Sequence, residues 1–183
     1  MIDADVKAVH IFIATSDIHM RYKLRMSREE VIKAAVDAVS YAKSHGLTVE
    51  FSAEDATRSD PNFLTRVFQE VVNAGADRLD IADTVGIMWP SKIASLVRFI
   101  RESVKGNYLL SVHCHDDFGM AVANSVAAIE AGADQGQGKK KVSFKQLPGP
   151  QTRDEIVCPL LLLKKKKKKN TTLTPQPKTI VCI

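Results

Sequence analysis

The stretch "LLSVHCHDDFGMAVANS", residues 109–125, begins with the apolar run of a buried strand and continues into residues typical of a helix. Successive side chains of a strand point to opposite sides, so His113 and His115 should project together while Cys114 points toward the helix layer. Two imidazoles placed in this way could bind one divalent metal ion, or they could be hydrogen-bonded groups that cap the following helix. The stretch therefore predicts a strand–helix unit with polar residues at the carboxyl end of its strand.

The same pattern recurs toward the amino terminus at regular intervals. Short apolar runs that predict strands lie at 9–15, 49–52, 78–82 and 109–113, and helical patterns lie at about 27–46, 61–75, 90–103 and 119–131. Val49, Leu79 and Leu109 follow one another at intervals of about 30 residues, which is the length of one strand–helix unit. The fold class expected is α/β, with about four such units around a sheet of parallel strands.

The sequence changes character after Gln135. Residues 1–135 contain 14 Lys and Arg against 19 Asp and Glu, whereas residues 136–183 contain 12 against 2, so the net charge of +5 comes from the carboxyl-terminal part. That part has lysine runs at 139–141 and 164–169, scattered prolines and no amphipathic helix of useful length. We therefore expect residues 136–183 to be a low-complexity, lysine-rich tail that is mostly disordered.

The lysine-rich tail could bind nucleic acid or an anionic membrane through its charge alone. No aromatic residue interrupts the lysines at 164–169, and a poly-A stretch in the gene would encode the same run. We therefore expect no specific nucleic-acid partner and no membrane partner.

The composition argues against several classes of protein. Apolar residues make up 45% of the chain, which is enough for a sizeable core, but the longest apolar runs are too short to span a bilayer. Met1 is followed by Asp3 and Asp5 rather than by the basic and then apolar residues of a secretion signal. Three cysteines are too few for a disulfide framework. A cytoplasmic protein is the expectation.

Polar segments stand at the carboxyl ends of all four predicted strands. They read "ATSD" (14–17), "FSAEDATR" (51–58), "IADTVG" (81–86) and "HCHDD" (113–117). The carboxyl ends of parallel strands meet at one edge of a sheet, where α/β barrels and open α/β sheets build their active sites. We expect one set of side chains to converge there: Glu54, Asp83, Thr84, His113 and His115.

The chemistry of these groups suggests roles for them. A divalent ion on two imidazoles, with positions left open, could chelate and polarise an α-keto acid. Glu54 could orient that substrate or shuttle a proton, or it could pair with Arg58. The Thr84 hydroxyl could hold the substrate carboxylate, or it could cap the turn before Gly86. His10 lies inside the first predicted strand, where by itself it suggests a hydrogen-bonded core histidine.

Four segments, in this order, resemble one enzyme family: "HIFIATSDIHMRYKLRMSREEV" (10–31), "VEFSAEDATRSDPNFL" (49–64), "IADTVGIMWP" (81–90) and "VHCHDDFGMAVANSVAAIEAGAD" (112–134). They look like the 2-isopropylmalate synthase and homocitrate synthase group of the metallolyase barrels, which also includes hydroxymethylglutaryl-CoA lyase. The resemblance covers roughly residues 6–135.

This resemblance implies a (β/α)8 barrel that binds a divalent metal (Mn, Mg or Zn) and condenses acetyl-CoA with an α-keto acid. It implies that His113 and His115 are metal ligands, that Glu54 is a catalytic residue of the keto-acid site, and that Thr84 and His10 contact the substrate. Full-length relatives are expected to be homodimers.

The sequence also departs from the family pattern. Nothing before Val6 matches the Arg-Asp-Gly-Glu motif of the family's first strand, and the glycine-rich segment that carries a further Asn ligand does not follow Gln135. Asp116 stands where the synthases usually carry Asn, and with Asp117 it could cap the following helix. We therefore expect residues 1–135 to form a partial barrel that binds metal weakly or not at all and does not turn over substrate.

The function expected from the resemblance is that of an ancestral 2-isopropylmalate synthase of leucine biosynthesis. Homocitrate synthase and citramalate synthase are alternatives within the family. A lyase that cleaves hydroxymethylglutaryl-CoA is another, although "HCHDDFGMAVANS" is closer to the synthases than to the "HCHDTYGQALAN" of the lyases. A non-catalytic fragment with a polycation tail is the fourth possibility.

Overall fold

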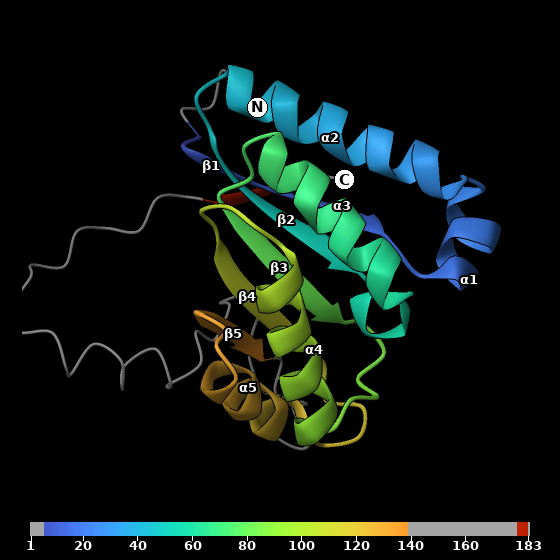
Figure 1. Cartoon of the computed structure of the whole chain (residues 1–183), viewed down its shortest axis with the longest axis vertical. Coiled ribbons are helices and arrows are strands. Elements are labelled where there is room, and N and C mark those ends of the chain that lie inside the picture. The colour runs from blue at the N-terminus through green and yellow to red at the C-terminus, as the bar shows by residue number, and fades with distance from the viewer. Residues whose placement is uncertain (1–5, 139–178, 183) are drawn as a thin grey trace, which may run out of the picture.

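Residues 6–138 and the backbone of residues 179–182 are described by the computed structural model of this chain. The elements are, in chain order, β1 (Ala8–Ala14), α1 (Asp17–His19), the π-helical turn η2 (Met20–Leu24), α2 (Arg28–Ser44), β2 (Thr48–Glu54), the 3-10 turn η3 (Ala56–Arg58), α3 (Pro61–Asn73), β3 (Arg78–Asp83), α4 (Pro90–Ser103), β4 (Leu109–Cys114), α5 (Ala121–Glu130), β5 (Gln135–Gly138) and β6 (Thr179–Cys182). The strands form one sheet with the order β5-β4-β3-β2-β1-β6, and every neighbouring pair is parallel (Figure 1). The predicted α/β fold is confirmed.

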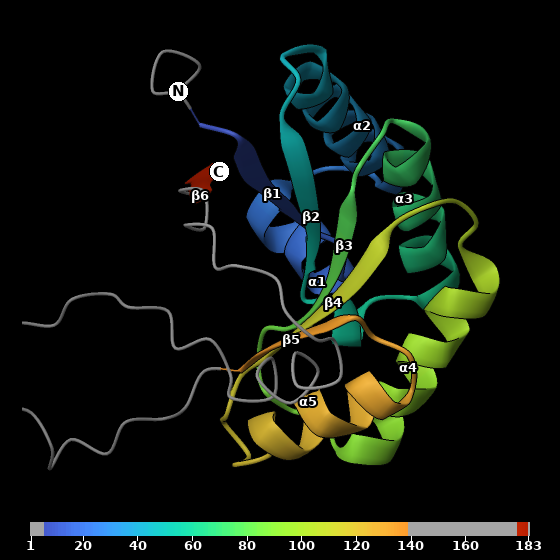
Figure 2. The same cartoon turned by 90° about the vertical axis from the view of Figure 1, so that its left-hand side faces the viewer.

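The four long helices, α2 to α5, lie on the same side of the sheet (Figure 2). Each connects two neighbouring parallel strands, as a crossover helix does. Repeated crossovers of this kind build a (β/α)8 barrel, and here they form about half of one. The described strands make an open sheet, with β5 and β6 at its two edges.

Helix starts are set by local signals that the sequence shows clearly. The Ser27 hydroxyl accepts a hydrogen bond from the Glu30 amide, and the Glu30 carboxylate accepts one of 2.8 Å from the Ser27 amide, which is a complete capping box at the start of α2. At the start of α3, the Asp60 carboxylate accepts from the Phe63 amide at 2.8 Å and Pro61 occupies the first turn. Both predicted helix starts are confirmed.

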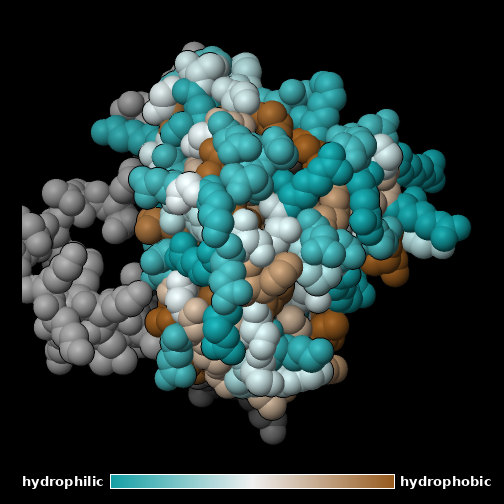
Figure 3. Space-filling view, viewed as in Figure 1, coloured by the Kyte–Doolittle hydropathy of each residue, from teal (hydrophilic) through white to brown (hydrophobic). Residues whose placement is uncertain are grey.

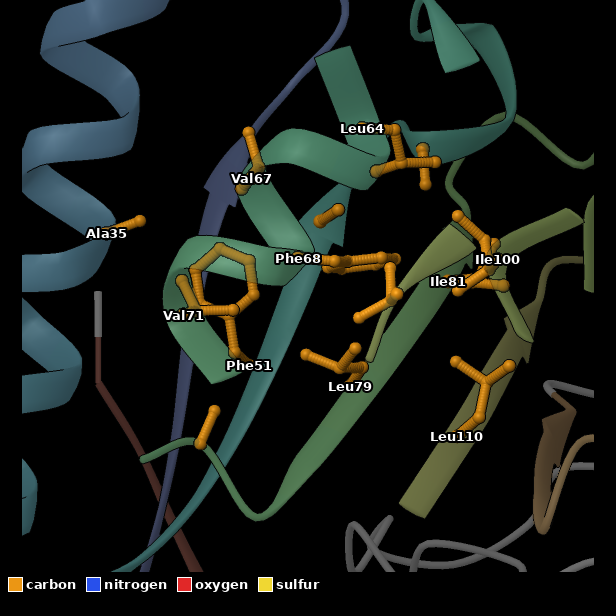
Figure 4. Close-up of a cluster of buried hydrophobic side chains, with 14 of the residues drawn as sticks. Ala35, Phe51, Leu64, Val67, Phe68, Val71, Leu79, Ile81, Ile100 and Leu110 are labelled. Atoms are coloured by element: carbon orange, nitrogen blue, oxygen red, sulfur yellow. The ribbon is translucent and has the colours of Figure 1, made fainter. Parts of the chain in front are cut away.

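The hydrophobic core lies between the sheet and the helices (Figure 4). Phe51 of β2 packs edge-on against Phe68 of α3, with ring centroids 6.3 Å apart, and neither ring is exposed to solvent. The outer side of the helices is largely hydrophilic, with scattered apolar residues (Figure 3). Within the described residues, no helix is both long and apolar enough to cross a membrane.

The opposite face of the sheet is polar. Register places Ser52, Asp80, Ser111 and Gln135 side by side on β2, β3, β4 and β5. Because side chains alternate along a strand, other polar residues two positions away share this face. They are His10, Glu50, Glu54, Arg78, His113 and Gln137. In a (β/α)8 barrel the helices cover the outer face of the sheet, so this polar face corresponds to the interior of the barrel.

The sheet extends beyond the four strands that the sequence predicted. β5 begins at Gln135, where the strand pattern was expected to stop, and β6 pairs with β1 inside the segment expected to be mostly disordered. The sequence of β5 is QGQG, which has no strand propensity, and its position comes from pairing with β4 and from the packing of Gly136 against Ser125 of α5. Residues 139–178 lie outside the described residues, so disorder in the tail stays a prediction for them.

Candidate functional site

Four of the predicted site residues lie at the carboxyl edge of the sheet. Glu54 ends β2, Thr84 follows β3, and His113 and His115 stand at the end of β4. The two imidazole rings project together, with centroids 5.0 Å apart and planes at 41°. His10 is different, because it faces Glu50 in the register and so lies four residues, about 13 Å, before the position of Glu54 on the same face. The structure therefore places His10 nearer the amino-terminal edge of the sheet than the other residues.

Asp83 does not join this group, contrary to expectation. It lies one residue before Thr84 and so points to the opposite side of the sheet, where it is fully buried. Its carboxylate accepts hydrogen bonds from the Thr57 hydroxyl at 2.9 Å and from the amides of Ile87 and Met88 at 3.3 and 3.1 Å. Asp83 therefore holds the loop that follows β3.

Glu54 is paired with a lysine that the sequence had not indicated. Lys23 Nζ donates to Oε1 and Oε2 of Glu54 at 2.7 and 2.9 Å. Lys23 belongs to η2, a single π-helical turn that brings residues after β1 over the end of β2. The alternative partner considered for Glu54, Arg58, binds Asp55 instead. The carboxyl edge thus contains a cation beside the expected catalytic carboxylate.

Asp55 ties together the loops after β1, β2 and β3. Its buried carboxylate accepts hydrogen bonds from Arg58 and is 2.9 Å from His19 Nδ1, while its amide donates to the Thr84 hydroxyl at 2.8 Å. Burial acts to raise the pKa of Asp55, but the hydrogen bonds from Arg58, Ser16 and His19 outweigh it and hold the pKa below its ordinary value.

The Thr84 hydroxyl thus receives a hydrogen bond from a neighbouring loop, and it does not cap the turn before Gly86 by any contact that the structure describes. Its own proton remains available for donation, because a hydroxyl is both a donor and an acceptor. An anionic oxygen at this edge could receive that proton.

The loops after β3 and β4 touch at Gly86. A Cβ atom on Gly86 would lie 2.7 Å from Oδ2 and 2.8 Å from the amide nitrogen of Asp117, and Gly86 has a φ of +61°. The N-cap residue of α5 is Met120, but Asp116 accepts a hydrogen bond of 3.0 Å from the amide of Ala121, the first residue of the helix. These contacts fix the loop that carries His115.

His113 is linked to the interior of the polar face. Its Nδ1 is 3.2 Å from Oε1 of Gln137, whose amide nitrogen donates to Glu50 at 3.1 Å. Glu50 also accepts from Arg78 at 3.0 Å. Gln137 was missed because it lies in the segment assigned to the tail, and its two contacts become visible only when β5 is placed beside β4.

His10 ends a second chain of hydrogen bonds. Its Nε2 is 2.6 Å from the Ser52 hydroxyl, and that hydroxyl donates to Oδ2 of Asp80 at 2.6 Å. The pKa of Asp80 is raised to about 6, mainly by burial; Glu50 contributes to this rise and the Ser52 hydrogen bond opposes it. His10 is therefore a hydrogen-bonded histidine on the polar face.

A metal ion fits part of this arrangement. His113 and His115 offer two imidazoles of the kind that Mn, Zn and related ions accept. Within residues 6–138, however, no group of three or more His, Cys, Asp or Glu side chains comes together as a metal site. Glu54 is paired with Lys23, and Asp83 is bound to its own loop. The described residues therefore supply two donors and do not complete a site.

Comparison with known proteins agrees with this geometry. The family model described as HMGL-like matches residues 1–138. This chain belongs to the HMGL-like family. A probable 2-isopropylmalate synthase of Ignicoccus hospitalis is 62% identical over 134 residues, which are 73% of this chain and 33% of that protein. The matched segment thus spans about a quarter to a third of the length of the curated relatives.

Other members of the HMGL-like family are similar as well. A homocitrate synthase of Methanopyrus kandleri is 56% identical over 72% of this chain and 33% of its own length. A citramalate synthase of Methanocaldococcus jannaschii is 53% identical over 73% and 27%. Among solved structures, hydroxymethylglutaryl-CoA lyase of Pseudomonas aeruginosa superposes with a TM-score of 0.65 at 22% identity, over 73% of this chain and 46% of that one. At that identity the likeness shows the fold.

Proposed function

We propose that residues 6–138 form part of the active site of an acyltransferase that condenses acetyl-CoA with an α-keto acid, of the 2-isopropylmalate synthase type. The observation that carries the proposal is the placement of Glu54, Thr84, His113 and His115 at one carboxyl edge of a half-barrel sheet. The identity of 62% to a probable 2-isopropylmalate synthase supports the 2-isopropylmalate synthase type. Homocitrate and citramalate synthases remain alternatives, because they are nearly as similar.

Each residue then has a role that its contacts allow. His113 and His115 contribute two imidazole ligands, and a bound divalent ion would polarise the keto oxygen of the substrate. The Thr84 hydroxyl donates to the substrate carboxylate, since its acceptor side is already bound to the Asp55 amide. Glu54 accepts hydrogen bonds from Lys23 and orients the keto acid or moves a proton.

The 183-residue chain by itself is proposed to be inactive. A Claisen condensation needs the bound keto acid, a base that deprotonates acetyl-CoA, and groups that stabilise the enolate in one geometry. The described residues supply two metal donors, and the matched segment covers only 33% of the Ignicoccus hospitalis relative. Losing groups that act as a unit reduces the rate by several powers of ten.

A chimaera tests the synthase assignment. The matching 134 residues of the Ignicoccus hospitalis relative are replaced by the segment from this chain, and thiol release from acetyl-CoA is measured with 2-oxoisovalerate and manganese, magnesium or zinc. We expect release that His113→Ala abolishes and that Lys33→Gln, on the outer surface of α2, leaves unchanged. Cleavage of hydroxymethylglutaryl-CoA, without thiol release from acetyl-CoA in the presence of any α-keto acid, would replace the synthase assignment with a lyase.

The isolated 183-residue chain is assayed beside the chimaera under the same conditions. No turnover is expected. Turnover by the homogeneous chain that disappears in His113→Ala would contradict the proposed inactivity.

A further inference from the structure

A buried chain of hydrogen bonds crosses three strands and ends on His10. Asp80 of β3 is 1% exposed and Ser52 of β2 is 5% exposed, and the Ser52 hydroxyl lies 2.6 Å from both the Asp80 carboxylate and His10 Nε2. Two short contacts on one buried hydroxyl define an ordered arrangement rather than a chance approach.

The number of hydrogens on these three side chains fixes which group donates in each hydrogen bond. A serine hydroxyl has one hydrogen, and Ser52 donates it to Oδ2 of Asp80. The Ser52 oxygen can therefore only accept from His10, so the hydrogen must be on His10 Nε2. In a neutral imidazole the lone pair is then on Nδ1.

We propose that Asp80 is a positioning residue which, through Ser52, holds neutral His10 as the Nε2–H tautomer with its lone pair on Nδ1. The role of this tautomer in substrate contact rests on the proposed function and on the family resemblance, which implies that His10 contacts the substrate. With Nε2–H committed to Ser52, His10 offers a substrate an acceptor and no donor. His10 therefore contacts a proton-donating group, such as the hydroxyl of a 2-hydroxy-acid product or a bound water, and not the keto oxygen.

The neighbouring polar groups, Glu50 and Ser111, do not take the place of Asp80 in orienting Ser52. Glu50 stands beside His10 in the register, but its carboxylate is bound to Arg78 and to Gln137. Ser111, beside Asp80 on β4, is buried and shares the same face without a described hydrogen bond to Ser52 or His10. The buried carboxylate that orients Ser52 is that of Asp80.

Long-range proton–nitrogen NMR spectra of the imidazole rings measure the tautomer directly. The 183-residue chain is labelled with ¹⁵N-histidine and studied at mildly alkaline pH, and the His10 signals are identified by their loss in His10→Gln. We expect a single Nε2–H pattern for His10. The Nδ1–H pattern, or rapid averaging of the two, in the unmodified chain would overturn the proposal without any further variant.

Variants then test whether Ser52 and Asp80 set the tautomer. Ser52→Ala removes the hydroxyl that joins His10 to Asp80. Asp80→Asn supplies an amide that can donate to Ser52, so that the Ser52 hydroxyl can donate to His10. Both variants should therefore give a mixture of His10 tautomers. Ser52→Thr keeps the hydroxyl and should keep the Nε2–H pattern, and Ser125→Ala, which removes a buried serine hydroxyl of α5 that binds the Ala121 carbonyl, should leave it unchanged. An unchanged His10 pattern in folded Ser52→Ala would show that Asp80 does not act through Ser52. The spectra are independent of thiol release, so the proposed function can fail while the tautomer holds.

Discussion

Gln137 Nε2 donates a hydrogen bond of 3.1 Å to Glu50 Oε1, although 87 residues separate them in sequence and β3 and β4 lie between their strands. Neighbouring strands are about 4.8 Å apart, so on a flat sheet β2 and β5 would be about 14 Å apart. The bond therefore requires the sheet to curve toward its polar face, as a barrel wall does. That curvature brings His113 and Glu54 toward a common centre.

The contact between Gly86 and Asp117 predicts an unusually costly substitution. Gly86→Ala places a methyl group against the Asp117 backbone and also forces an alanine to adopt a φ of +61°. Gly46→Ala forces a similar φ of +71°, but nothing lies within 4 Å of its Cβ. We expect Gly46→Ala to lower the free energy of unfolding by about 1 kcal/mol, and Gly86→Ala by roughly 2 to 4 kcal/mol. Urea unfolding measures both, and equal losses would show that the loops after β3 and β4 are not in contact.

The lowered pKa of Asp55 predicts a dependence of stability on pH. A carboxyl group whose pKa is lower in the folded than in the unfolded protein stabilises the fold above its ordinary value of 3.8 and loses that contribution as pH falls further. Asp55→Asn should therefore destabilise the protein at neutral pH by roughly 1 to 3 kcal/mol, and the difference should shrink in acid below about pH 4.

Asp37→Asn is the matched control for Asp55→Asn. Asp37 forms an exposed pair with Lys33 on α2, so its loss should change the free energy of unfolding by less than about 0.5 kcal/mol at any pH. Unfolding curves between acid and neutral pH give both differences. A loss in Asp55→Asn that does not vary with pH would mean that the charge of Asp55 does not stabilise the loops.

Cys114 is predicted to be chemically inert in the folded protein. It is fully buried on the helix side of β4, and burial raises the pKa of its thiol to about 12, with Asp83 and Asp80 adding to the rise. Since the thiolate is the reactive form, a thiol reagent should not modify Cys114 until the protein unfolds. The measurement uses a chain with Cys158→Ser and Cys182→Ser. Modification at the same rate with and without denaturant would contradict the buried position.

Much of the fold could be predicted because its signals are local. Ser27 and Asp60 are caps within three residues of the amides that they bind, and apolar residues recur at alternate positions of β2 to β4. The pairing of His113 with His115 follows from the alternation of side chains along a strand. The same alternation places Asp83 and Thr84 on opposite sides of the sheet, so the wrong prediction that Asp83 joins the site could have been avoided.

The remaining site contacts depend on register between distant strands. Ser52 and Asp80 are unremarkable in sequence, and Ser52 contacts both His10 and Asp80 because β1, β2 and β3 lie side by side. Lys23 reaches Glu54 through a π-helical turn that no sequence pattern indicated. β5 has two glycines and no apolar residue, so only its pairing with β4 identifies it.

Paramagnetic relaxation by Mn²⁺ is the most direct test that the carboxyl edge is a metal and keto-acid site. Mn²⁺ is added to the ¹⁵N-labelled 183-residue chain together with 2-oxoisovalerate, and line broadening is recorded for each backbone amide. We predict weak binding that broadens residues around Glu54, Thr84 and His115 before those at the amino-terminal ends of the strands. His113→Ala should remove this pattern, whereas His45→Ala, at the far end of α2, should not. Broadening centred elsewhere, or unaffected by His113→Ala, would contradict the account.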